Sequence, residues 1–261
     1  MNLEEYTRMR ELEEFSWWFR GRQAIVERLL EAHTPFGTPG ANLTILDAGC
    51  GTGKILTDFT RRGHLVVGLD FSDRALDYTA ARGAELLVRG DAQAMPLNNA
   101  AFDLVVALDT LEHVADDQAM VTEIFRVLRP GGFAIFNVPA HPRLWSEHDI
   151  ALQHFRRYTP DSLRAVVASA GFSITRFTYS MAAVYPVAAL VRLASPYRPH
   201  LDKPAQSHMR RHWGPLNAAL SVVMRAESRL IRRVNMPIGL SLLTLVQRPE
   251  AAAAHDSSPH A

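Results

Sequence analysis

The sequence predicts an α/β fold: a doubly wound, mostly parallel seven-stranded sheet with helices on both faces, an N-terminal helical lid and a helical insertion before the last strand. First, short apolar runs alternate with helical segments between residues 44 and 138, which requires a parallel sheet covered on both sides. Second, a run ending in Asp47 passes into Gly49, Gly51 and Gly53, as a buried strand does when it turns sharply into a helix. Third, acids end the strands, where open α/β sheets bind their ligands.

Length and composition limit the class of protein. At 261 residues with a formal net charge of +1, the chain is one large domain or a domain with a subdomain, and its charge gives no argument for nucleic-acid binding. The single cysteine, Cys50, indicates a reducing compartment. The N-terminus has no apolar signal segment, and no apolar run reaches the roughly 18 residues of a membrane span. We therefore expect a cytoplasmic protein that binds no nucleic acid.

The first 40 residues are predicted to form a helical lid and a linker. Apolar residues recur at mainly three-and-four spacing over residues 4–33, which predicts a helix. The segment 17–22 is dense in aromatic and cationic side chains. It either packs on the sheet or covers a bound cofactor, because aromatic faces suit a cation and Arg20 or Arg22 can meet a carboxylate.

The glycine-rich turn after Asp47 indicates a cofactor that contains a nucleoside. The helix that begins near Gly53 presents its free N–H groups and the positive end of its dipole to a ligand. Asp70 ends a second apolar strand, residues 65–69, where its carboxylate can accept hydrogen bonds from both hydroxyls of a ribose. The spacing Gly49-x-Gly51-x-Gly53 departs from the dinucleotide fingerprint, which argues against a nicotinamide cofactor.

Several segments in sequence order resemble the class I S-adenosylmethionine (SAM) dependent methyltransferases over residues 40–180. The first is the glycine turn, and the second is Gly90-Asp91-Ala92, which follows a predicted strand at 84–88. The third is a predicted fourth strand at 102–109, after which residues 111–114 open a helix. The fourth is the segment 126–132, which precedes a predicted fifth strand at 133–138. The segment 141–158, with His148-Asp149 and Arg156-Arg157-Tyr158, resembles an unassigned bacterial small-molecule subgroup of that family.

The resemblance implies SAM as the cofactor and places residues around it. Gly49 and Gly51 would contact the methionine portion, and Asp47 would help to orient it. Asp70 would hold the ribose hydroxyls. The rest of the pocket would come from Phe71 beside the adenine, Asp91 and Ala92 at the adenine edge, and Leu108 on the fourth strand.

The predicted SAM-binding core spans residues 41–180 and takes its last strand from residues 238–248. Thr159 suits the N-cap of a helix that runs to residue 170, and residues 172–179 form a sixth strand. In the resembled family the last two strands usually form an antiparallel hairpin, but here an insertion at 181–237 precedes the seventh strand, 240–247. The tail 249–261 has no periodicity and is expected to be disordered.

The insertion is predicted to hold two helices, residues 182–194 and 216–234, joined by a loop that contains proline and histidine. Lysine and arginine outnumber acids nine to two over residues 181–234. Three interpretations stay open: a solvated face of a cap, docking to an anionic membrane surface, or recognition of an anionic substrate. A homodimer through the cap helices also stays open. The apolar side of the second helix is predicted to comprise Leu220, Val223, Leu230, Ile231 and Val234.

Catalytic residues are expected after the fourth and fifth strands, because methyl transfer to a weak nucleophile needs alignment and a proton acceptor. After the fourth strand, His113 ends the run Asp109-x-x-Glu112-His113. Some quinone-biosynthesis O-methyltransferases place a metal near a similar acid-rich segment. Asp109 replaces the glutamate usual there, so we expect a hydrogen-bonded pocket histidine and no metal.

The segment 141–158 after the fifth strand is rich in histidine, arginine and aromatic residues, and it is predicted to hold the methyl acceptor. His148 is the expected base, with Asp149 as the acid that orients its imidazole. An arginine, Arg156 or Arg157, can anchor an anionic substrate group. The residues expected to contact the acceptor are His141, Trp145, His154, Arg156 and Tyr158.

These features together predict transfer of a methyl group from SAM to an oxygen or nitrogen of a small-molecule acceptor. One alternative is a methyltransferase for a lipid- or polyprenyl-linked substrate that rests on a membrane through residues 181–234. Another is a SAM-binding regulatory protein without turnover. A SAM-using cyclase or decarboxylase is a further alternative, because the fold does not fix the reaction.

Overall fold

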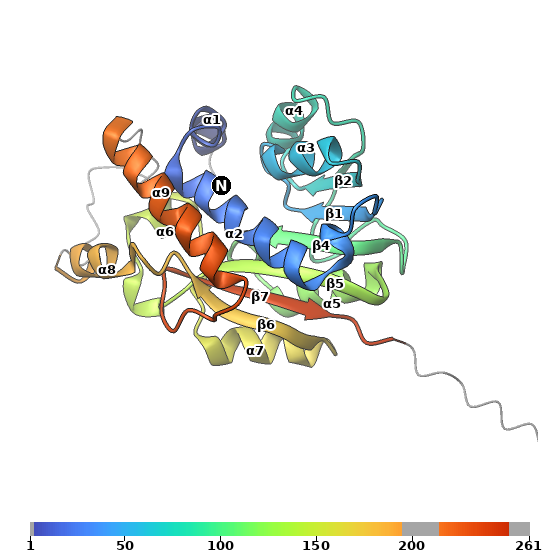
Figure 1. Ribbon diagram of the computed structural model, residues 1–261. Helices are drawn as coiled ribbons and strands as arrows, with labels where there is room; N and C mark the ends of the chain where they lie inside the picture. Colours follow the sequence, from blue (N-terminus) through green and yellow to red (C-terminus); the bar gives the residue numbers. More distant parts are fainter. Residues whose placement is uncertain (1–2, 195–213, 251–261) are drawn as a thin grey trace, which may run out of the picture.

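Seven strands form one mixed sheet in the computed structural model, which describes residues 3–194 and 214–250. The strand order is β3-β2-β1-β4-β5-β7-β6, and β7 runs antiparallel to both of its neighbours (Figure 1). The predicted sheet and the antiparallel pairing of its last two strands are confirmed. The strands are β1 (Thr44–Ala48), β2 (Leu65–Asp70), β3 (Leu87–Arg89), β4 (Phe102–Leu108), β5 (Leu128–Pro139), β6 (Ser173–Ser180) and β7 (Ser241–Gln247).

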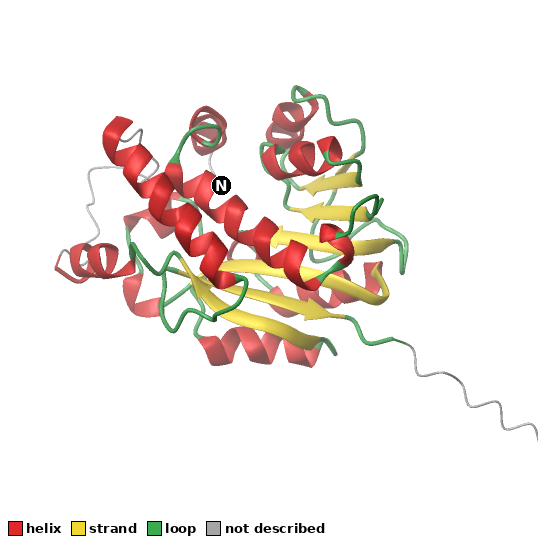
Figure 2. Cartoon of the chain, viewed as in Figure 1, coloured by secondary structure: helices red, strands yellow, loops and turns green. Residues whose placement is uncertain are grey.

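Helices cover both faces of the sheet and enclose two apolar cores (Figure 2). On one face α5 and α7 bury Ile124 and Val167, and on the other α2, α3 and α9 bury Leu29, Phe59 and Met224. The helices are α1 (Leu3–Leu12), α2 (Trp17–His33), α3 (Lys54–Arg61), α4 (Asp73–Ala80), α5 (Asp117–Val127), α6 (Glu147–Ala151), α7 (Pro160–Ser169), α8 (Tyr185–Ala194) and α9 (Gly214–Ile231).

Side chains at the helix starts explain where several helices begin. The carboxylate of Asp116 accepts a hydrogen bond from the backbone N–H of Ala119 at 2.9 Å and caps α5. The hydroxyl of Thr159 accepts one from the N–H of Ser162 at 3.2 Å, and Pro160 follows in the first turn of α7. The predicted start of α7 is therefore confirmed.

The single helix predicted over residues 4–33 is wrong, because the chain breaks between α1 and α2. Glu13 and Ser16 lie buried in this break, and Glu13 accepts a hydrogen bond of 2.6 Å from the hydroxyl of Thr52 in the glycine turn. Two other boundaries also differ. The strand expected at 84–88 lies at β3, and residues 111–114 begin with a short 3-10 turn, η2 (Leu111–His113), before α5 starts.

The insertion contributes two helices to the body of the protein. In Figure 1, α9 lies along α2, and the side chain of Asn217 joins them: it accepts from the N–H of Trp17 and donates to the carbonyl of Phe15, both at 2.9 Å. The apolar side predicted for α9 is largely wrong, since the buried positions are Ser221, Met224, Glu227, Ser228 and Ile231. The predicted loop between α8 and α9 and most of the predicted disordered tail lie outside the described residues.

Within residues 3–194 and 214–250, no helix combines the length and apolar character needed to cross a membrane.

Candidate functional site

A cavity of about 1500 Å³ opens at the carboxyl ends of β1, β2, β4 and β5. Its walls come from the glycine turn after β1, the N-terminal helices, η2 and α8. Cavities for one small ligand usually measure about 300–1000 Å³. This cavity therefore has room for a nucleoside cofactor and a second molecule side by side.

The glycine turn forms the floor of the cavity and requires glycine at its first position. Gly49 has φ +82°, and a Cβ there would collide with the side chain of Thr110. The backbone N–H of Gly51 donates to Asp70 Oδ2 at 2.9 Å, and the N–H of Ser72 donates to Asp70 Oδ1 at 2.9 Å. Each carboxylate oxygen keeps a lone pair for a further donor, so Asp70 can still receive two hydroxyls.

Asp47 is a buried acid at the end of β1 and faces the same cavity. Burial, and after it the charge of Asp70, raise the pKa of its carboxyl to about 7, while the guanidinium of Arg22 acts in the opposite direction. The carboxyl group is therefore poised between its neutral and ionised forms near neutral pH. A cationic ligand beside it would favour the ionised form.

All eight residues that the sequence assigned to the cofactor line this cavity. Phe71 is 72% exposed and offers its ring at the rim, while Leu108 and Ala92 are buried in the wall. Asp91 lies at the surface, where its carboxylate accepts the backbone N–H of Gln93 at 2.8 Å. Their roles toward SAM stay predictions. The eight residues are Asp47, Gly49, Gly51, Asp70, Phe71, Asp91, Ala92 and Leu108.

The N-terminal helices line one side of the cavity and also pack on the sheet, and their covering of a bound cofactor stays a prediction. Trp17, Trp18 and Phe19 line it, and Arg22 on α2 forms an ion pair with Asp109 at the end of β4. Asp109 has φ +52°, a conformation that L-residues rarely adopt. It is held there by Arg22 and by the side-chain amide of Asn137, which donates to it at 2.5 Å.

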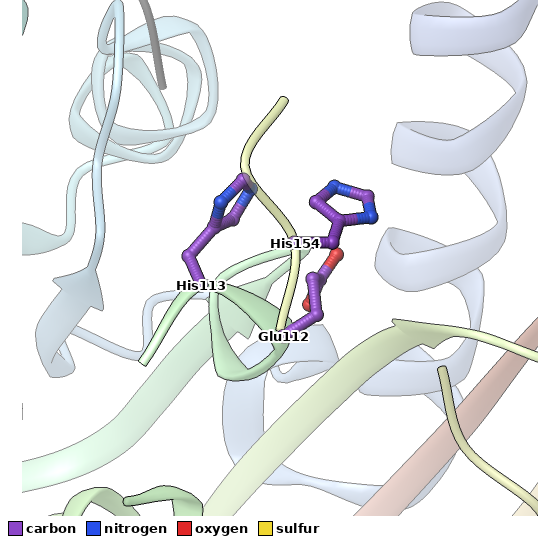
Figure 3. Close-up of side chains that lie close together, drawn as sticks. All are labelled: Glu112, His113 and His154. Atoms are coloured by element: carbon purple, nitrogen blue, oxygen red, sulfur yellow. The ribbon is translucent and has the colours of Figure 1, made fainter. Parts of the chain in front are cut away.

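On the acceptor side, three side chains converge that we call the acid–histidine cluster: Glu112, His113 and His154. One ligand atom from each lies within 4.8 Å of the others, and the rings of His113 and His154 meet edge to face with centroids 4.7 Å apart (Figure 3). In Figure 3 the carboxylate of Glu112 points toward the ring of His154. Burial, and after it the neighbouring His154, lower the pKa of His113 to about 3, so His113 is neutral at pH 7.

Asp149 orients His154 instead of the expected His148. Its Oδ1 lies 3.0 Å from Nδ1 of His154, and the guanidinium of Arg157 pairs with both carboxylate oxygens at 2.7 and 2.9 Å. Burial alone would raise the pKa of Asp149, but the bond from His154 and the charge of Arg157 bring it well below its usual range. Neighbouring side chains on a helix point to different faces, so Asp149 on α6 turns inward while His148 lines the cavity.

Four of the residues expected to contact the acceptor lie outside the cavity lining. Three of these four have a structural partner elsewhere in the protein. His141 stacks on Tyr179 with ring centroids 5.3 Å apart. Arg156 pairs with Asp117 at 2.9 Å, and the hydroxyl of Tyr158 donates to the same carboxylate at 2.8 Å. Trp145 ends a short 3-10 turn, Pro142–Leu144. His154 and the predicted catalytic residues His113 and His148 do line the cavity, whereas Asp149 lies behind it.

Sequence reasoning missed several cavity residues. Tyr6 and Met9 of α1 reach the cavity, although nothing in their helical spacing marks them for a ligand. Arg192 of α8 also lines it, and burial lowers the pKa of its guanidinium to about 10. Glu112 belongs to the Asp-x-x-Glu-His run, and this run is the sequence signal that could have identified it as a site residue. Its burial could not be predicted from the sequence.

Comparison with known proteins supports the cofactor interpretation. Residues 46–136 match the model of a methyltransferase domain. A probable S-adenosylmethionine-dependent methyltransferase of Mycolicibacterium smegmatis is 32% identical over 169 residues, which cover 62% of each chain. An uncharacterized methyltransferase of Mycolicibacterium gilvum is 31% identical over 62% of this chain and 71% of its own length. The chain belongs to the class I SAM-dependent methyltransferases.

Comparison with solved structures shows that the chain has the fold of known methyltransferases. Phosphoethanolamine N-methyltransferase 2 of Haemonchus contortus, in complex with phosphomonomethylethanolamine and S-adenosylhomocysteine, superimposes with a TM-score of 0.57 over 88% of this chain and 53% of its own, at 16% sequence identity. At this identity the similarity extends to the fold and not to the acceptor.

Proposed function

We propose that this protein transfers the methyl group of SAM to an oxygen or nitrogen of a small-molecule acceptor. The observation that carries the proposal is that one cavity joins two different sites: the glycine turn with Asp70 on one wall and the acid–histidine cluster on another. The first has the donors and acids that a nucleoside cofactor needs. The second has groups that can act on a proton.

The chemistry is an in-line displacement. A lone pair of the acceptor attacks the methyl carbon, the bond from that carbon to the positive sulfur breaks, and S-adenosylhomocysteine leaves. The aromatic side chains of Trp17 and Trp18 line the cavity and suit a sulfonium cation. The acceptor loses its proton on the side of the acid–histidine cluster, which takes the role expected for His148 and Asp149.

Calorimetry of SAM and S-adenosylhomocysteine against the whole chain tests the cofactor half. Asp70→Ala removes the proposed ribose contacts, and we expect binding to weaken by about 2–4 kcal/mol, roughly 30- to 1000-fold. Asp77→Ala, an exposed acid on α4 outside the cavity lining, is the matched control and should bind like the unaltered protein. Failure of the folded, unaltered protein to bind either compound would refute the proposal.

Turnover is tested with methyl-labelled SAM and a panel of small hydroxylated and amino compounds. His154→Gln should bind S-adenosylhomocysteine normally but transfer label to any active acceptor at least about 100-fold more slowly, in line with loss of a group that acts on the proton. Equal turnover in this variant would remove the cluster from the reaction.

A second candidate is an acceptor carried on a lipid at a membrane surface. On α8, Val187 and Leu190 are each 69% exposed, Arg225 and Arg229 are exposed on α9, and the exposed Arg232 directly follows that helix. Exposed apolar and cationic helix surfaces of this kind suit an anionic membrane. Co-sedimentation with anionic vesicles, absent with neutral ones, would favour this acceptor class over a freely dissolved one.

A further inference from the structure

We propose that the acid–histidine cluster binds a divalent transition-metal cation through Glu112, His113 and His154. The residues come from two separate parts of the chain. Glu112 and His113 belong to the turn η2 after β4, and His154 follows α6 some forty residues later. Asp109, which belongs to the same sequence run, is not part of this set because it pairs with Arg22.

The three side chains lie close enough together for small rotations to bring them onto one ion. Their ligand atoms lie within 4.8 Å of one another. Zinc binds imidazole nitrogen and carboxylate oxygen at about 2.0–2.2 Å in tetrahedral geometry, so two ligand atoms of one ion lie about 3.3–3.6 Å apart. Side-chain rotations that bring the ligand atoms closer by up to about 1.5 Å would complete the site. Figure 3 shows the two rings and the carboxylate arranged around one shared space.

Glu112 provides an independent sign that a ligand is missing. Its side chain is 1% exposed, and its Oε2 is buried with no hydrogen-bond partner among the residues that the structure describes. A buried carboxyl oxygen without a partner is costly, and most such atoms in proteins are paired. A cation at the cluster would supply the partner that the described residues do not provide.

Asp149 orients the imidazole of His154 in the way that carboxylates usually orient histidines that bind metals. Histidines that bind metals commonly donate their second ring nitrogen to a carboxylate, which fixes the tautomer. Here Nδ1 of His154 lies 3.0 Å from Asp149, so Nε2 is left for a ligand. Asp149 is itself held by the backbone N–H of Ser146 at 2.8 Å and by Arg157. Asp149 thus caps the start of α6 and at the same time fixes the orientation of the His154 ring toward the cavity.

A ligand set of two imidazoles and one carboxylate favours transition-metal ions and leaves a coordination position of the ion free for substrate. Imidazole ligands favour zinc, iron, cobalt or nickel over magnesium, and three protein ligands leave a position for water or substrate. That position faces the cavity, because all three residues line it. If the proposed methyl transfer holds, the ion would bind an acceptor oxygen and lower the pKa of its hydroxyl. The proton leaves to solvent, and the oxygen then attacks the methyl carbon.

Metal binding is tested without turnover, on the untagged whole chain stripped of metals with a chelator. We expect one Zn²⁺ per chain by mass spectrometry after dialysis, and visible absorption of bound Co²⁺ with four or five ligands. Glu112→Gln and His154→Gln should weaken Zn²⁺ binding at least about 100-fold, and Asp149→Asn by about 10- to 100-fold. His33→Gln, which removes a histidine outside the cavity lining, should have no effect.

Binding of S-adenosylhomocysteine to each variant shows that it is folded, and it keeps the two proposals separate. Stoichiometric binding that survives Glu112→Gln and His154→Gln would place the metal elsewhere and overturn the inference. So would the lack of any one-to-one binding of Zn²⁺ or Co²⁺ by protein that still binds S-adenosylhomocysteine. Loss of S-adenosylhomocysteine binding by unaltered protein that still binds metal would instead count against the methyltransferase proposal.

Discussion

Replacing Asp47 by asparagine should make the free protein progressively more stable than the unaltered one as the pH rises. The carboxyl has its pKa raised from 3.8 to about 7 in the folded state, chiefly by burial. Between these two values the native protein holds a proton that the unfolded chain has lost. The stability linked to this proton is complete below about pH 4 and is lost as the pH rises through 7.

The size of the effect follows from the shift. Between pH 5 and pH 7 the native protein binds about one more proton than the unfolded chain, so the free energy of unfolding falls by about 1.4 kcal/mol per pH unit. The Asp47→Asn variant lacks this proton. Its stability relative to the unaltered protein should therefore grow by about 3 kcal/mol between pH 5 and pH 8.

Urea unfolding of both proteins at several pH values measures this difference, with Asp77→Asn as an exposed control that should show no trend. A difference that stays constant within about 1 kcal/mol from pH 5 to pH 8 would refute the reasoning. Calorimetry supplies the functional counterpart. Because a cationic cofactor favours ionised Asp47, SAM should bind the unaltered protein more tightly at pH 8 than at pH 6, and the variant more weakly at both.

Three further changes test how the cavity is built. Gly49→Ala should abolish SAM binding and lower the free energy of unfolding by about 1–3 kcal/mol, because φ is +82° and the added methyl meets Thr110; calorimetry that finds normal affinity would contradict this. Arg22→Met should weaken SAM binding about tenfold and cost about 1–3 kcal/mol in urea unfolding, because Asp109 loses its guanidinium partner. Asn217→Ala removes two hydrogen bonds between α9 and the start of α2, so it should cost about 1–2 kcal/mol and speed proteolysis at the N-terminal helices; unchanged cleavage would argue against this joint.

The cofactor side of the cavity was predictable because its signals are local. Gly49 must adopt a left-handed conformation beside a neighbouring side chain, and Asp70 follows an apolar strand at the edge where parallel sheets bind ligands. Each of these features is encoded within one strand and its turn. The order of the strand and helix signals then predicted the parallel part of the sheet, and the family resemblance implied the antiparallel last strand.

The acceptor side was predicted less well because it is assembled from contacts that sequence spacing does not show. Adjacency in sequence suggested that Asp149 would orient His148, but side chains one position apart on a helix do not face each other, and Asp149 meets His154 instead. Glu227 on α9 shows the same limit. Nothing in the sequence around it indicates burial, yet it is buried and accepts the backbone N–H groups of Ala182 and Ala183 at 3.0 and 3.1 Å.

The buried acids around the cavity differ in how far the protein's own groups compensate them, and this difference indicates where ligands belong. Asp149 lies behind the cavity and is compensated by Ser146, His154 and Arg157, and its pKa is lowered. Asp70 and Glu13 line the cavity and have raised pKa values, but each accepts hydrogen bonds from the protein. Asp47 also has a raised pKa, and Glu112 has a buried oxygen with no hydrogen-bond partner among the described residues. A buried carboxyl without full compensation destabilises a fold. Because Asp47 and Glu112 both line the cavity, we infer that their compensation comes from ligands: the cationic cofactor at Asp47 and the metal ion at Glu112.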